Sequence, residues 1–106
     1  MSKLHGVLSL AIAFLFGALV YASDPPVYKP KEGYVPDERT AIRVAEAILV
    51  PIYGEEQIKS ELPLSAKLKD DVWVVTGNLP AGADGGVAEV RISKRTGEIL
   101  GVTHGK

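Results

Sequence analysis

The chain has 106 residues, with 12 basic and 13 acidic side chains, a formal net charge of −1 and no cysteine. This balanced charge excludes the clustered Lys and Arg on which nucleic-acid binding depends. The lack of cysteine excludes disulfide bonds and a lipid-modified cysteine. We therefore expect a single small domain that is stabilised by packing alone.

Residues 1–22 have the pattern of a secretory signal peptide. Lys3 precedes an uncharged apolar run, Gly6–Val20, and small residues stand at the positions that a signal peptidase reads. The run is shorter than the roughly 20 residues of a membrane-spanning helix. We expect cleavage after Ala22 and a periplasmic or secreted protein that does not contact the membrane. The alternative is an uncleaved N-terminal membrane anchor.

Residues 23–33 contain three prolines and no periodic apolar pattern. This composition predicts an extended linker, with a Pro-rich ligand motif as the alternative. The folded domain is expected to occupy residues 34–106.

A helix is predicted from Asp37, whose side chain suits the N-cap position. Apolar residues then recur at helical spacing and form a broad stripe. They are Ala41, Ala45, Ile48 and Ile52, with Ile42, Leu49 and Tyr53 in the adjoining row.

The segment "VPIYG" predicts a corner between two helices. Pro51 cannot donate to the carbonyl of Ala47, so the helix should kink or end there. Ile52 and Tyr53 are expected to reach the core after the bend, and Gly54 to close the helix in a left-handed conformation. A short second helix is expected over residues 55–61. We interpret Tyr53 as a packing anchor, with ligand binding as the alternative.

Alternating apolar and polar residues predict four strands, over residues 64–69, 72–79, 87–93 and 98–104. We expect a turn at Asp70 and Asp71, and another over residues 94–97 with Gly97 at positive φ. The residues expected to face the core are Leu64, Ala66, Leu68, Trp73, Val75, Leu79, Ala88, Val90 and Ile92. We interpret Trp73 as a core residue rather than a binding platform.

Short connections between consecutive strands indicate an antiparallel meander with one solvated face. The fold class is therefore α+β: a kinked N-terminal helix and a short helix packed on a four-stranded sheet, in a cystatin-like or partial nuclear-transport-factor-2-like arrangement.

No group of residues is spaced for catalysis, and no cofactor or metal is expected. His104 is the one histidine outside the signal peptide, too few for a zinc site. We interpret it as a surface residue at a strand end. The glycine-rich residues 82–86 lack the lysine of a phosphate-binding loop. Asp70, Asp71 and Asp84 do not match a calcium-loop spacing and are interpreted as turn residues.

Several short segments together resemble one family. They are "GYVPD" at Gly33–Asp37, "PIYG" at Pro51–Gly54, Trp73, "GGVA" at Gly85–Ala88, and "HG" at His104–Gly105. The chain resembles the immunity proteins of nuclear-transport-factor-2-like fold from bacterial polymorphic toxin systems. The resemblance implies a non-enzymatic protein that binds and neutralises a cognate toxin.

Two alternatives stay open. The segment "VAEVRISKRTGEILGV" also resembles PepSY domains, which implies a protease-inhibitory or envelope-associated module. A small enzyme with an acidic pocket between helices and sheet is the other, and it would require a buried Asp or Glu with a raised pKa.

We expect a protein partner to bind the polar face of the sheet, because mixed charge on a rigid sheet suits electrostatically selected binding. The alternative is that this face is merely solvated. The candidate partner-binding residues are Lys67, Lys69, Glu89 and Arg91, followed by Tyr34 and the loop over residues 80–86.

Overall fold

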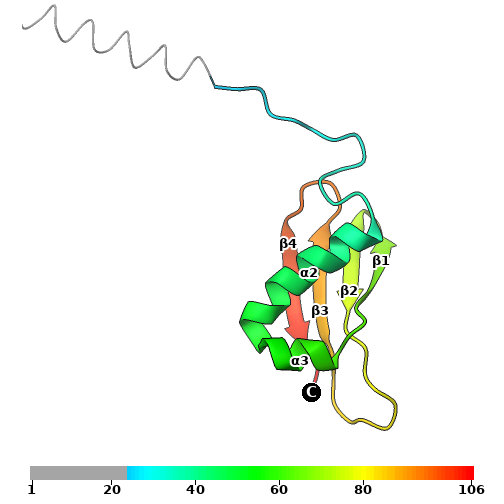
Figure 1. Cartoon of the computed structure of the whole chain (residues 1–106). Coiled ribbons are helices and arrows are strands. Elements are labelled where there is room, and N and C mark those ends of the chain that lie inside the picture. Colours follow the sequence, from blue (N-terminus) through cyan, green and yellow to red (C-terminus); the bar gives the residue numbers. More distant parts are fainter. Residues whose placement is uncertain (1–23) are drawn as a thin grey trace, which may run out of the picture.

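The computed structural model describes residues 24–106, and the predicted signal peptide lies outside these described residues. Two helices, α2 (Glu38–Tyr53) and α3 (Glu55–Ser60), lie across one face of a four-stranded antiparallel sheet (Figure 1). The strands follow the sequence order β1 (Ser65–Lys69), β2 (Val72–Thr76), β3 (Ala88–Ser93) and β4 (Ile99–His104). The predicted α+β fold is confirmed. Within the described residues, neither helix has the length and apolar character needed to cross a membrane.

Helix α2 begins at an N-cap. The Asp37 carboxylate accepts hydrogen bonds from the backbone N–H of Thr40, at 2.8 Å, and from its hydroxyl, at 2.7 Å. These bonds hold the pKa of Asp37 below its usual value, since they favour the charged form.

The helix continues through Pro51 to Tyr53, where the N–H of Gly54 donates to the carbonyl of Val50 at 2.8 Å. Gly54 has a φ of 95° and joins α2 to α3. The expectation that Ile52 reaches the core is wrong, because its side chain is 55% exposed. In the same turn it is Tyr53 that packs against His104 of β4, and Ile52 lies on the solvent side.

The core lies between the helices and the inner face of the sheet. The Nε1–H of Trp73 donates to the carbonyl of Val35 at 2.8 Å, so this buried side chain also anchors the segment that precedes α2. Each inner residue is one of an alternating set along its strand. The buried apolar residues are Val35, Ala41, Ala45, Leu49, Ile58, Leu64, Ala66, Trp73, Val75, Ala88, Val90 and Ile92.

Two further residues expected in the core lie outside it. Leu68 is 47% exposed, because it stands near the end of the edge strand β1, where the helices give it little cover. Leu79 is 41% exposed, because β2 ends at Thr76 and Leu79 belongs to the following loop.

The hairpin turns define the register of the sheet. Asp70 and Asp71 both have positive φ, 49° and 61°, as a two-residue hairpin turn requires. The turn between β3 and β4 contains Gly97 at a φ of 78°. A register shift between Arg91 and Ile92 marks an irregularity where β3 pairs with β4.

Candidate functional site

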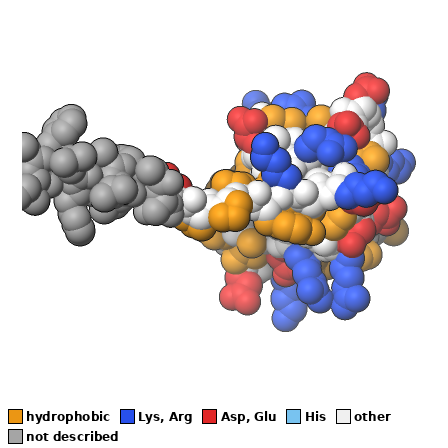
Figure 2. Space-filling model, turned by 90° about the horizontal axis from the view of Figure 1, so that it is seen from above, with side chains coloured by type: hydrophobic (Ala, Val, Ile, Leu, Met, Phe, Trp, Pro, Cys, Tyr) orange, Lys and Arg blue, Asp and Glu red, His pale blue; other side chains and the backbone are white. Residues whose placement is uncertain are grey.

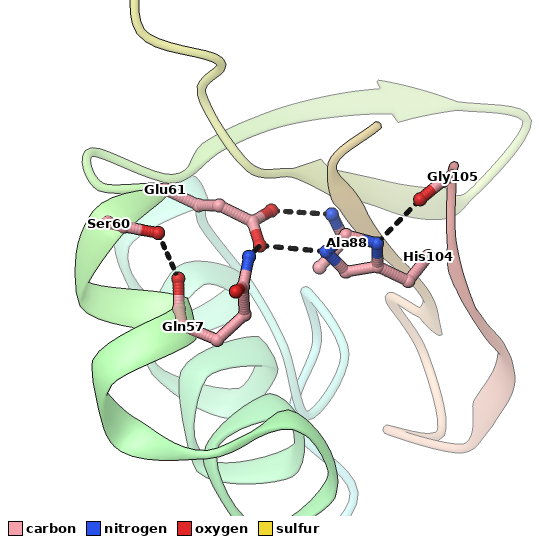
Figure 3. A network of polar contacts seen from close by, with 6 residues as sticks. All are labelled: Gln57, Ser60, Glu61, Ala88, His104 and Gly105. Carbon is pink, nitrogen blue, oxygen red and sulfur yellow. Dashed lines mark hydrogen bonds and ion pairs between the residues drawn. The ribbon is translucent and has the colours of Figure 1, made fainter. Parts of the chain in front are cut away.

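Glu61 is the one buried charged side chain among residues 24–106, and it is only 2% exposed. It directly follows the last turn of α3 (Figure 3). Its Oε1 accepts the backbone N–H of Ala88 at 2.6 Å, and its Oε2 accepts from Gln57 Nε2 at 2.9 Å. Oε2 also lies 2.9 Å from His104 Nε2. We call Gln57, Glu61, Ala88 and His104 the Glu61 junction.

The junction depends on local structure at each of its members. Gln57 lies on α3 and Glu61 is the C-cap residue four positions later, so their side chains lie on the same side of the helix end. Gly77 leaves room for the carboxylate, since a Cβ at this position would overlap Glu61 Oε1. The carbonyl of Glu61 accepts the N–H of Asn78 at 2.6 Å, so the same residue also anchors the start of the loop between β2 and β3.

His104 presents both ring nitrogens to acceptors. Its Nε2 faces Glu61, and its Nδ1 lies 2.7 Å from the carbonyl oxygen of Gly105. A neutral imidazole carries a single N–H, so only the doubly protonated ring can donate to both. The Tyr53 ring covers the imidazole at a centroid distance of 5.0 Å, and the side chain is 22% exposed. His104 is the last residue of β4, as expected, but its side chain is half-buried and hydrogen-bonded rather than a free surface group.

The pKa directions agree with a charged pair. The hydrogen bond with Glu61 raises the pKa of His104. Burial by itself would raise the pKa of Glu61, but the hydrogen bonds from Gln57, Ala88 and His104 outweigh it and hold this pKa below its usual value. A buried acid with a raised pKa would have supported the enzyme alternative, and Glu61 shows the opposite direction.

The contacts make the junction a structural anchor. Both carboxylate oxygens already accept hydrogen bonds, and the nearby Ser60 hydroxyl donates to the carbonyl of Gln57 rather than to His104. No cluster of three or more metal-ligating side chains occurs within residues 24–106. The junction connects the end of α3, the start of β3 and the end of β4.

The predicted partner-binding residues of the sheet lie on the face opposite the helices. Lys67, Lys69 and Arg91 are exposed and Glu89 is half-buried, and their positions alternate with core residues along β1 and β3. We call this surface, formed by the outward residues of the four strands, the open face. Tyr34 lies apart from it, against the turn between β3 and β4, where its N–H donates to the carbonyl of Arg95. Partner binding by these residues stays a prediction.

The surface hollows lie away from the junction. One, of about 260 Å³, is lined by residues of α2, α3 and the segment after α3, which include Glu46, Val50 and Leu62. A second, also about 260 Å³, lies between the N-terminal segment at Pro30 and the turn at Thr96. Figure 2 shows basic, acidic and apolar side chains interspersed on the visible surface.

One comparison with known proteins identifies the family. The sequence model of a family described as NTF2 (nuclear transport factor 2) fold immunity protein matches residues 40–106. The chain belongs to this family. No curated protein and no solved structure matches it. The resemblance seen in the sequence is thus confirmed, and the match to this immunity-protein family includes most of α2, all of α3, the whole sheet and the Glu61 junction.

Sequence reasoning assigned no role to Glu61, which stands in a run of polar residues at the end of α3. Its partner His104 is 43 residues away in the sequence. A signal was present in the spacing of Gln57 and Glu61, which places both side chains on one face of α3 beside the buried Ile58. The Glu61 junction therefore joins residues that are distant from one another in the sequence.

Proposed function

We propose that this protein is an exported, non-enzymatic immunity protein that neutralises a cognate bacterial toxin by direct binding. Membership of the NTF2 fold immunity family supports a role in toxin immunity. The predicted signal peptide at residues 1–22 supports export. The family match also favours a toxin over the protease of the PepSY-like alternative.

The observation that carries the binding mode is the open face of the sheet. Both helices of the described chain pack on the other face, so a rigid four-stranded surface is left to solvent (Figure 1). Antiparallel sheets tolerate one solvated face, and such a face offers a preorganised docking surface with a small entropic cost of binding. The Glu61 junction, by contrast, has its hydrogen-bonding groups occupied by the protein itself.

The test begins with the genes beside this chain's gene, where we expect one for a secreted protein with a toxin domain, and it uses that domain. Bacteria that export this toxin domain are expected to grow only when they also produce the full-length immunity protein. A matched variant without residues 1–22 tests export, because it should fail to protect against a toxin that acts outside the cytoplasm. Protection by both forms would overturn the export step.

A titration of purified toxin domain with the purified protein tests the mechanism of neutralisation. Direct binding predicts that toxin activity falls linearly and reaches its minimum near one equivalent, together with a complex in size-exclusion chromatography. Complete inactivation by a small fraction of an equivalent would indicate enzymatic inactivation and would refute the binding proposal.

A further inference from the structure

The open face has a defined arrangement of cationic and apolar side chains. The strand register places Lys67 beside Val74, Val74 beside Arg91, and Arg91 beside Gly101. The neighbouring row contains Lys69 and Val72. Adjacent strands lie about 4.8 Å apart, so Lys67 and Arg91 flank Val74 at about 10 Å from each other.

Gly101 lies beneath the Arg91 guanidinium on this face. A Cβ at Gly101 would stand 2.5 Å from Arg91 Nη2, so the missing side chain leaves room for the guanidinium above β4. A glycine inside a strand weakens the strand, and it is typical of places where another group approaches closely. Gly101 therefore allows the guanidinium to lie close to the sheet.

The three cations of the open face are not neutralised by ion pairs. Within residues 24–106, the two ion pairs are those of Lys94 with Glu32 and of His104 with Glu61. Neither involves Lys67, Lys69 or Arg91.

Acidic groups lie mainly at the ends of the open face and on the other side of the protein. Glu89 stands one row away, between Thr76 and Thr103, and Asp70 and Asp71 lie in the turn beyond β1. The helices carry both signs: Glu38 and Glu46 with Arg39 and Arg43 on α2, and Glu55 and Glu56 with Lys59 on α3. A chain with a formal net charge of −1 thus has its central sheet face lined by cations.

We propose that the open face binds an acidic surface of the partner protein, whose carboxylates pair with Lys67, Lys69 and Arg91 around an apolar contact on Val72 and Val74. This inference rests on the proposed function, since the partner is the toxin. An apolar centre with a charged rim is the usual composition of a protein–protein interface. The cations would repel the basic cleft of a nucleic-acid-binding enzyme. The contact surface of the toxin is therefore acidic and is not a nucleic-acid-binding cleft.

Two charge-reversed variants of the full protein test the assignment. The sheet variant carries Lys67→Glu, Lys69→Glu and Arg91→Glu. The matched helix variant carries Glu46→Lys, Glu55→Lys and Glu56→Lys, which changes as many charges on the opposite side.

The Kd for the toxin domain is expected to rise at least about 10-fold in the sheet variant and to change less than about 3-fold in the helix variant. The melting temperature of each variant shows that it folds. The opposite order of effects would overturn the proposal. If the sheet variant instead changes from dimer to monomer in light scattering and keeps its toxin affinity, the open face binds a second copy of the chain, and the proposal is wrong.

A second probe separates this inference from the proposed function. Octaglutamate and octalysine peptides are added to the ¹⁵N-labelled protein, and amide chemical shifts are followed by NMR. Octaglutamate should shift amides of β1, β2 and β3, and octalysine should leave these amides unchanged. If the wild-type protein does not bind the toxin domain, the proposed function fails, while the peptide shifts still report whether the open face selects acidic ligands. Octaglutamate shifts confined to other regions would refute the inference.

Discussion

Replacing Glu61 by alanine should destabilise the domain more than any exposed substitution, because one side chain satisfies donors from three segments. The change removes the carboxylate that accepts the buried hydrogen bond of the Ala88 N–H. The same carboxylate is the hydrogen-bond partner of Gln57 and His104.

The expected magnitude follows from these contacts. A buried donor without an acceptor costs about 1–3 kcal/mol, and removing one partner of a buried charged pair costs about 3–5 kcal/mol in all. We expect Glu61→Ala to lower the free energy of unfolding by about 3–5 kcal/mol. For a domain of this size each kcal/mol lowers Tm by about 4–8 °C. Glu61→Gln should cost less, about 1–2 kcal/mol, since an amide oxygen can still accept the Ala88 N–H.

The assay is urea unfolding followed by circular dichroism, with a thermal melt of the same samples. Glu46→Ala, an exposed change on α2, is the matched control and should stay within about 0.5 kcal/mol of the wild type. A Glu61→Ala protein within about 1 kcal/mol of the wild type would refute the reasoning, because it would show that water replaces the lost acceptor without cost.

Three other predictions concern pH, the helix corner and the domain boundary. The pKa of His104 is raised above its ordinary value of 6.5, so its stabilising contribution is complete below that pH and is lost as pH rises through the folded-state pKa. The pKa of Glu61 is lowered from 4.5, so its contribution is complete above that pH and is lost as pH falls through the folded-state pKa. Urea midpoints from pH 2 to 9 should show both losses, and a profile without the loss above pH 6.5 in wild type would contradict the His104 assignment. At the corner, Gly54→Val should cost about 1–2 kcal/mol because φ is 95°, and Pro51→Ala should cost less; the reverse order in thermal melts would contradict this. Finally, a chain of residues 33–106 should keep a cooperative melt, because the contacts that it loses are exposed ones of the N-terminal segment, which contribute little to stability. A non-cooperative melt would disprove that boundary.

The sequence predicted the elements whose cause is local. Asp37 as a cap and the Asp70–Asp71 turn each depend on residues within a few positions along the chain. The alternation in Ala88, Val90 and Ile92 likewise identified the inner face of β3, because the side-chain period of a strand is two. Such features could be predicted because the interactions that produce them are formed within each segment.

The errors have a common origin in the relative lengths of packed elements. Ile52 follows the helical stripe perfectly well, and Leu68 follows the strand alternation, yet both side chains are exposed. Periodicity gives the direction of a side chain from its own backbone. Whether another element covers it depends on where α2 and the sheet end relative to each other.

By itself, the sequence determined the α+β class, the order of the strands, the hairpin turns and the membership of an immunity-protein family. Only the tertiary structure decided that Glu61 is buried and that both ring nitrogens of His104 face hydrogen-bond acceptors. The reason is physical: the protonation of a histidine and the burial of a carboxylate depend on groups brought within 3 Å by packing, and here these groups stand 43 residues apart in the chain.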